Sequence, residues 1–137
     1  METPTSPAVL VVEDDPSVRE LISTALQDEG YRVLEARNAR EALRAVNEQP
    51  VTADPPCLIL LDFLMLPGND GVHLLEQLAA PRGRVPVIAM SASSQHLTAA
   101  RTAGADVALP KPFDLDRLVT LVSAYCLDAP GEVPYIQ

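Results

Sequence analysis

Five short apolar runs alternate with amphipathic helical patterns along almost the whole chain. Runs this short and this continuously apolar are typical of strands buried on both faces of a parallel sheet. Strict alternation of strands and helices predicts an α/β fold, in which helices cover both faces of one parallel sheet. The strands are expected at residues 8–12, 31–36, 57–61, 85–90 and 107–109.

Capping residues mark the helix boundaries. Asp15 followed by Pro16 predicts the N-cap and first position of the first helix, and Gly30 predicts its end. Asn38 and Asp114 are expected to cap the second and the last helix. Turn-forming residues predict a loop over 49–56 and a turn over 67–71. The apolar stripes place the helices at about 16–29, 39–46, 72–78, 93–103 and 115–127.

The length of 137 residues fits one compact domain, and 47% hydrophobic residues suffice for a core. We expect a flexible N-terminal segment over residues 1–7, a domain over 8–127 and a C-terminal tail over 128–137.

The chain is acidic, with 10 basic and 19 acidic residues and a net charge of −9. Such a surface disfavours non-specific nucleic-acid binding, because a phosphate backbone would be repelled. The sequence has no secretory-signal pattern and no apolar stretch long enough to span a bilayer, so a cytoplasmic protein without a membrane contact is expected. Cys57 and Cys126 fit no metal-ligand spacing and are interpreted as buried, reduced thiols. His73 and His96 are interpreted as surface residues.

Polar residues that can do chemistry end four of the five predicted strands. Glu13 and Asp14 follow the first strand, Asp62 the third, Ser91 the fourth and Lys111 the fifth. Because ligands gather at the carboxyl ends of strands in such a sheet, we expect these residues to form one site.

The composition of this site suits phosphoryl transfer. Clustered carboxylates repel one another unless a cation lies between them, and Mg²⁺ suits such a cluster. Asp62 could then act as the nucleophile toward phosphorus and form an acyl phosphate. Lys111, the only lysine of the chain, could neutralise the moving oxygens, and the hydroxyl of Ser91 could hydrogen-bond one of them.

These residues resemble the receiver family of two-component response regulators over about residues 8–127. The matching motifs are Leu10-Val11-Val12-Glu13-Asp14-Asp15, Leu60-Leu61-Asp62 with Pro67-Gly68 and Asp70-Gly71, Val85-Pro86-Val87-Ile88 to Ser91-Ala92, and Gly104-Ala105-Asp106 to Lys111-Pro112-Phe113. The resemblance implies a flavodoxin-like sheet with strand order 2-1-3-4-5.

The resemblance also implies a role for each site residue. Asp62 is the expected phosphoacceptor. Asp14 and Asp62 are expected to bind Mg²⁺ directly, Glu13 through water, and Leu64 through its backbone carbonyl. Ser91 is the expected switch hydroxyl and Lys111 the expected phosphate-binding lysine. The Lys111–Pro112 peptide bond is similar to one that is often cis in the family, and Asp15 is expected to act as a helix cap.

Two positions depart from the family pattern. The family proline usually stands four residues after the acceptor, whereas Pro67 stands five residues after Asp62. This insertion affects the loop that carries Leu64. The family often has an aromatic residue three positions before the lysine, where this chain has Ala108. The usual coupling, in which that aromatic ring rotates inward, cannot operate in that form.

The leading interpretation is a free-standing receiver that is phosphorylated by a histidine kinase or a histidine phosphotransfer protein. It would be an autocatalytic phosphoacceptor, with slow self-dephosphorylation, rather than an enzyme that turns over a substrate. Its output would pass to an unknown protein through the fourth helix, the fifth strand and the last helix, from a monomer or a phosphorylation-dependent dimer. The alternatives are a pseudo-receiver that needs no phosphate and a Mg²⁺-dependent phosphohydrolase. The second would need a general acid beyond Asp62, where the chain has Phe63 and Leu64.

Overall fold

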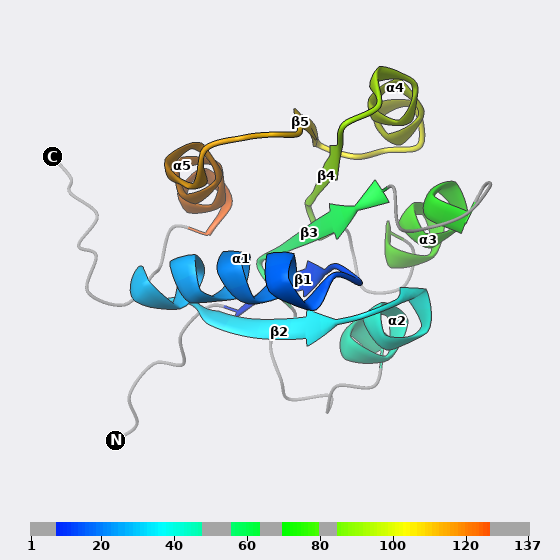
Figure 1. The fold of residues 1–137 in the computed structure, drawn as a ribbon. Coiled ribbons are helices and arrows are strands. Elements are labelled where there is room, and N and C mark those ends of the chain that lie inside the picture. Colours follow the sequence, from blue (N-terminus) through cyan, green and yellow to red (C-terminus); the bar gives the residue numbers. More distant parts are fainter. Residues whose placement is uncertain (1–7, 48–55, 64–69, 80–84, 127–137) are drawn as a thin grey trace, which may run out of the picture.

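The computed structural model describes residues 8–47, 56–63, 70–79 and 85–126, which form a five-stranded parallel sheet between two layers of helices (Figure 1). The strand order is β2-β1-β3-β4-β5, which confirms the expected order and the α/β class. The elements follow one another as β1 (Ala8–Val12), α1 (Pro16–Asp28), β2 (Arg32–Ala36), α2 (Ala39–Asn47), β3 (Leu58–Asp62), α3 (Asp70–Ala79), β4 (Val87–Ser91), α4 (Ser94–Thr102), β5 (Val107–Pro110) and α5 (Leu115–Tyr125).

The helices divide between the two faces of the sheet. Helices α1 and α5 cover one face, and α2, α3 and α4 cover the other (Figure 1). For α1 to α4 this division is expected from the strand order. The chain moves along the sheet in one direction from β1 to β2 and in the other from β2 to β5, and right-handed crossovers then place α1 on one face and α2, α3 and α4 on the other.

Successive residues of the central strands point into opposite halves of the core. Leu10, Ile59 and Leu61 pack toward α2, α3 and α4, whereas Val9 and Leu60 pack toward α1 and α5. All five residues of β1 and of β3 are buried, which explains why these strands are continuously apolar up to their carboxyl ends. Each fully buried leucine stabilises the fold by roughly 1.5–3 kcal/mol.

The parallel register places the carboxyl ends of the strands at one edge of the sheet. Asp62 is the register partner of Met90, and Ser91 is the register partner of Pro110. The backbone continues this pairing beyond the last strand, because the N–H of Lys111 donates to the carbonyl of Ser91 at 2.9 Å. The residues predicted to do the chemistry therefore lie at neighbouring positions of this edge.

Most of the predicted caps are confirmed. Oδ1 of Asp15 accepts from the N–H groups of Ser17 and Val18, and Oδ1 of Asn38 accepts from Glu41 N–H at 2.9 Å. Gly30 follows α1 with φ 98°, a left-handed conformation that favours glycine. Asp114 occupies the N-cap position of α5, but its side chain makes no capping hydrogen bond.

The cysteine prediction was wrong, because Cys57 and Cys126 form a disulfide. Helix α5 runs back along the sheet, so its carboxyl end lies beside the amino end of β3. The two Cα atoms are 5.6 Å apart, within the usual range for a disulfide. The hydroxyl of Tyr31 donates to the carbonyl of Cys126 at 3.3 Å and fixes the same corner.

Several predictions fall on residues outside the described ranges, namely the N-terminal segment 1–7, most of the loop 49–56, most of the turn 67–71, Leu64 and the tail 128–137. Within the described ranges, every helix is too short or too polar to cross a bilayer.

Candidate functional site

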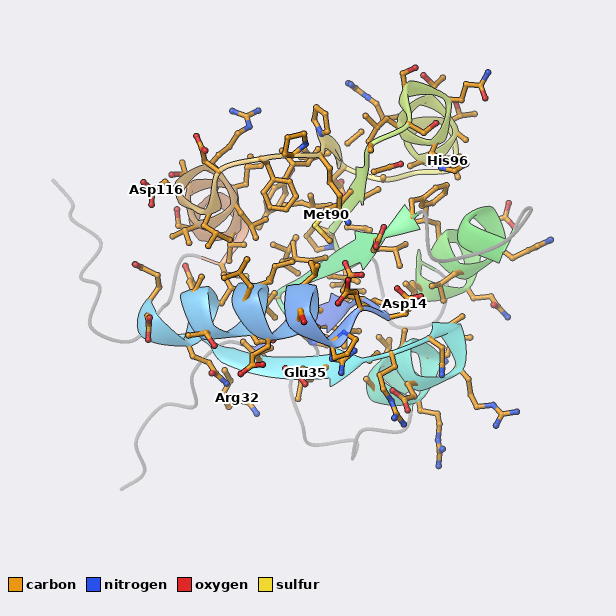
Figure 2. The ribbon with its side chains drawn as sticks, viewed as in Figure 1. Asp14, Arg32, Glu35, Met90, His96 and Asp116 are labelled. Atoms are coloured by element: carbon orange, nitrogen blue, oxygen red, sulfur yellow. A yellow bond between two sulfur atoms is a disulfide. The ribbon has the colours of Figure 1, made fainter. Side chains whose placement is uncertain are left out.

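Three carboxylates meet at the carboxyl edge of the sheet. Glu13, Asp14 and Asp62 each place one oxygen so that these oxygens all lie within 4.8 Å of one another. Glu13 and Asp62 are buried, whereas Asp14 is exposed at the end of β1, beside the first turn of α1 (Figure 2). The structure thus brings together the acidic residues that the sequence predicted.

Backbone contacts hold Glu13 in place. Its N–H donates to the carbonyl of Ala36 at 3.0 Å, and its own carbonyl accepts from Nη1 of Arg19 at 2.8 Å. Oε2 of its side chain accepts from the N–H of Asp15 at 3.2 Å. None of the described residues hydrogen-bonds Oε1, which is buried. Arg19 was not among the residues predicted for this site, although it lies one turn into α1, close to this strand end.

The pKa of Glu13 is raised from 4.5 to about 7. Burial is the largest cause, followed by hydrogen bonding to Asp62 and by the negative charge of Asp62. The N–H of Asp15 and the charge of Lys111 oppose the rise but do not cancel it. In the absence of a cation, burial and the neighbouring Asp62 therefore favour the protonated form of Glu13.

Lys111 supplies the positive charge on the other side of the cluster. Its Nζ lies 3.2 Å from Oδ2 of Asp62 and 3.6 Å from Oε1 of Glu13. Its side chain is 25% exposed, so the ammonium lies at the mouth of the site rather than beneath it. This is the position predicted for a lysine that neutralises charge developing at Asp62.

The donor set fits a hard divalent cation. Three carboxylates face one ammonium, so the ionised site keeps an excess of negative charge. The buried Oε1 of Glu13, which lacks a hydrogen-bond partner among the described residues, is an acceptor that a cation or its bound water would satisfy. Oxygen donors of this kind suit Mg²⁺, which uses a few carboxylates and retains several waters. Leu64, the predicted carbonyl ligand, lies outside the described residues.

Ser91 lies at the end of β4, fully buried, one position beyond the register partner of Asp62. Its Oγ accepts from the N–H of Ser93 at 3.0 Å. Ser93 in turn is the N-cap of α4, so the hydroxyl is tied to the start of that helix. The predicted switch hydroxyl is thus at the site and in contact with a helix that leaves it.

The surface interpretation is confirmed for His73 but was incomplete for His96. His73 is exposed on α3, 3.8 Å from Glu76. His96 is only partly exposed, on the side of α4 nearer β3 (Figure 2). Its Nδ1 lies 3.5 Å from Oγ of Ser91, and its ring centroid lies 6.3 Å from that of Phe63. Helical side chains lean toward the N-terminus of their helix, which allows this contact, but the sequence pattern around His96 did not predict it.

Of the two departures from the family pattern, the structure fully describes the one at Ala108. Ala108 lies within β5 beside Ala89, and its methyl group offers no ring that could rotate. The extra residue falls within 63–66, a segment of which the structure describes only Phe63. The Lys111–Pro112 bond is cis, as the resemblance implied.

Comparisons with known sequences agree with this geometry. Residues 9–123 match the response regulator receiver domain. The chain is 36% identical over 118 residues to the response regulator MprA of Mycolicibacterium vanbaalenii, covering 85% of this chain and 48% of MprA. It is 40% identical to the transcriptional activator protein PfeR of Pseudomonas aeruginosa, covering 82% of this chain and 35% of PfeR. The chain therefore spans about half or less of these relatives.

A relative of similar length and two solved structures extend the comparison. An uncharacterized 14.6 kDa protein of Leptolyngbya boryana is 37% identical over 96% of this chain and 99% of its own length. The receiver domain of the Francisella response regulator 1452 superposes with a TM-score of 0.74 at 32% identity, covering 88% of this chain and 97% of that one. The receiver domain of sensor histidine kinase PA1611 from Pseudomonas aeruginosa, with a magnesium ion in its active-site cleft, gives 0.76 at 27% identity over 90% and 100%.

Proposed function

The chain belongs to the family of response regulator receiver domains, and on that premise we propose that it accepts a phosphoryl group on Asp62 in a Mg²⁺-dependent reaction. The phosphorylated form signals by changing the surface that the domain offers to a protein partner.

One observation carries the proposal: a buried carboxylate, Asp62, lies 3.2 Å from the ammonium of Lys111 and within the acidic cluster of Glu13 and Asp14. A carboxylate in this setting is shielded from bulk water and faces a fixed positive charge. Positioning and charge neutralisation are what phosphoryl transfer mainly requires from a protein.

In the proposed step, a carboxylate oxygen of Asp62 attacks the phosphorus of a phosphohistidine or of a small acyl phosphate. The new bond joins that oxygen to phosphorus, and the bond from phosphorus to the donor nitrogen or oxygen breaks. The leaving group takes the electron pair of the broken bond and, in the case of imidazole, a proton from solvent. Lys111 balances negative charge on the transferred oxygens, and Ser91 donates a hydrogen bond to one of them.

Bound Mg²⁺ would screen the clustered carboxylates and neutralise charge on the phosphoryl oxygens. Asp14 and Asp62 would hold it directly, Glu13 through water and Leu64 through its carbonyl. The backbone contacts of Glu13 with Ala36 and Arg19 keep its carboxylate aimed into the cluster. Asp14, as the exposed member, would leave the entrance open to solvent and to the donor.

The partners follow from this chemistry. A histidine kinase or a histidine phosphotransfer protein would supply the phosphoryl group, in the cytoplasm. The output surface, which we define as α4, β5 and α5, would bind a downstream protein, either as a monomer or as a phosphorylation-dependent dimer. Ser91 is linked to α4 through Ser93 and to β5 through Lys111, which supports output on this side. Because the phosphoryl group stays on Asp62 after the transfer, the domain would act as a switch and not as an enzyme that turns over a substrate. It would lose the group by at most slow self-dephosphorylation.

Mg²⁺-dependent binding of beryllofluoride, a phosphoryl mimic, tests the proposal. We expect the wild type to bind beryllofluoride only when Mg²⁺ is present. Asp62→Asn should bind both Mg²⁺ and beryllofluoride poorly. Failure of the wild type to bind Mg²⁺ and beryllofluoride would favour the pseudo-receiver. Steady hydrolysis of a generic phosphate ester would instead favour a phosphohydrolase.

A further inference from the structure

The hydroxyl of Ser91 needs an acceptor before any phosphoryl group arrives. Ser91 is fully buried, so its proton is not donated to bulk water. Its Oγ already accepts from the N–H of Ser93 at 3.0 Å. The acceptor within reach among the described residues is Nδ1 of His96, 3.5 Å away.

Two further contacts position His96. Its backbone N–H donates to the side chain of Ser93, the cap of α4, at 3.3 Å. The ring packs at 60° against Phe63, the residue directly after Asp62, with 6.3 Å between centroids. His96 therefore touches both the switch hydroxyl and the neighbour of the phosphoacceptor, and it does so from the output surface.

We propose that His96 is a positioning residue that holds the hydroxyl of Ser91 in the unphosphorylated state and releases it on phosphorylation. This inference rests on the proposed function. In the resting state Ser91 O–H donates to Nδ1 of the tautomer that carries its proton on Nε2. A hydroxyl has one proton, so it donates either to His96 or to a phosphoryl oxygen.

The exchange of partners couples the site to α4. When Ser91 turns to the phosphoryl group, His96 loses its partner, and the first turn of α4 is freed from the end of β4. Ala108 has no ring to carry a signal along β5, so His96 gives this chain a route of its own from the hydroxyl to the output surface.

The test combines two measurements on the full chain. The first records the ¹⁵N shift of the His96 ring in the unphosphorylated protein. We expect Ser91→Ala to move the Nδ1 resonance, and an unchanged resonance would overturn the contact. The second measures the Kd for beryllofluoride at saturating Mg²⁺ in variants of His96.

His96→Leu keeps an apolar contact with Phe63 but cannot accept a hydrogen bond. We expect it to bind beryllofluoride about five-fold more tightly, because one neutral hydrogen bond no longer competes. His96→Asn, whose Oδ1 can take the place of Nδ1, should restore the affinity of the wild type. In a Ser91→Ala background, His96→Leu should have no effect.

Equal affinities for His96→Leu and His96→Asn would overturn the proposal, as would an effect of His96→Leu that persists without the hydroxyl. If the wild type itself fails to bind beryllofluoride, the proposed function fails and the switch with it. The ring spectrum distinguishes that outcome from failure of the His96 contact alone, because it needs no phosphoryl mimic.

Discussion

Nζ of Lys111 lies 3.2 Å from Oδ2 of Asp62, and this contact joins the ends of β3 and β5 across the intervening strand β4. Lys111 approaches from the mouth of the site, with its side chain 25% exposed, while the carboxylate lies beneath it. The pair places a positive charge beside the carboxylate that we propose as the phosphoacceptor.

Lys111→Ala should slow phosphorylation of Asp62 by acetyl phosphate roughly 100-fold, because a fixed charge at the transferred oxygens is lost. Lys111→Arg should recover little of this rate, since a planar guanidinium does not fit where a compact ammonium lies. The initial rate of mass gain measures both variants. Arg117→Ala, which removes an exposed charge from α5, is the matched control and should react like the wild type. Normal rates in Lys111→Ala would exclude a role for this ammonium.

Affinity for Mg²⁺ should fall as the pH is lowered below about 7. Burial and the neighbouring Asp62 raise the pKa of Glu13 to about 7, so cation binding must displace a proton from it below that pH. Calorimetric titration at several pH values should show an affinity loss approaching tenfold per pH unit.

Glu13→Gln should flatten this pH dependence. Glu41→Gln is the control, because Arg37 lowers the pKa of Glu41 to about 2 and this residue stays ionised throughout. A pH dependence that survives in Glu13→Gln would assign the titration to another group.

Glu13 should also make the metal-free protein less stable as the pH rises. Its pKa of about 7 in the folded state lies above its ordinary value of 4.5. The stabilising effect of its proton is therefore fully present below about pH 4.5 and is lost as the pH rises through about 7. At pH about 8, Glu13→Gln should raise the free energy of unfolding by about 1–2 kcal/mol, because it removes a buried charge. Urea titrations with a chelator present would measure this, and a destabilised variant would contradict it.

Reduction of the Cys57–Cys126 disulfide should lower the free energy of unfolding by up to about 4 kcal/mol. The bond closes a loop with a sequence separation of 69, and a cross-link of that length restricts the unfolded chain strongly. Unfolding with and without a thiol reductant measures the effect. The double variant Cys57→Ser, Cys126→Ser should be insensitive to reductant. Rapid alkylation of both cysteines in the untreated protein would show that the bond is absent.

The sheet, and the site residues at its carboxyl edge, could be predicted because their sequence signals are local. Each buried strand is apolar on both faces and stops at a polar residue, so Asp62 and Ser91 are visible as strand ends. The parallel arrangement then places such ends together without further information. The pairing of Lys111 with Asp62 follows from the same rule.

The remaining features depend on distances that no local pattern encodes. Cys57 and Cys126 are far apart in sequence, and only the return path of α5 brings them together. His96 has a polar helical neighbourhood, so its burial depends on how α4 packs over Phe63 and Ser91. Asp114 has the residue type of a cap but forms no capping bond, because residue preference alone does not set a side-chain direction.

The intact mass of the protein after incubation with Mg²⁺ and acetyl phosphate tests the central claim most directly. We predict one added phosphoryl group in the wild type, and none in Asp62→Asn or in a metal-free sample. An unmodified wild type that also fails to bind beryllofluoride would contradict the account, as would an adduct that persists in Asp62→Asn.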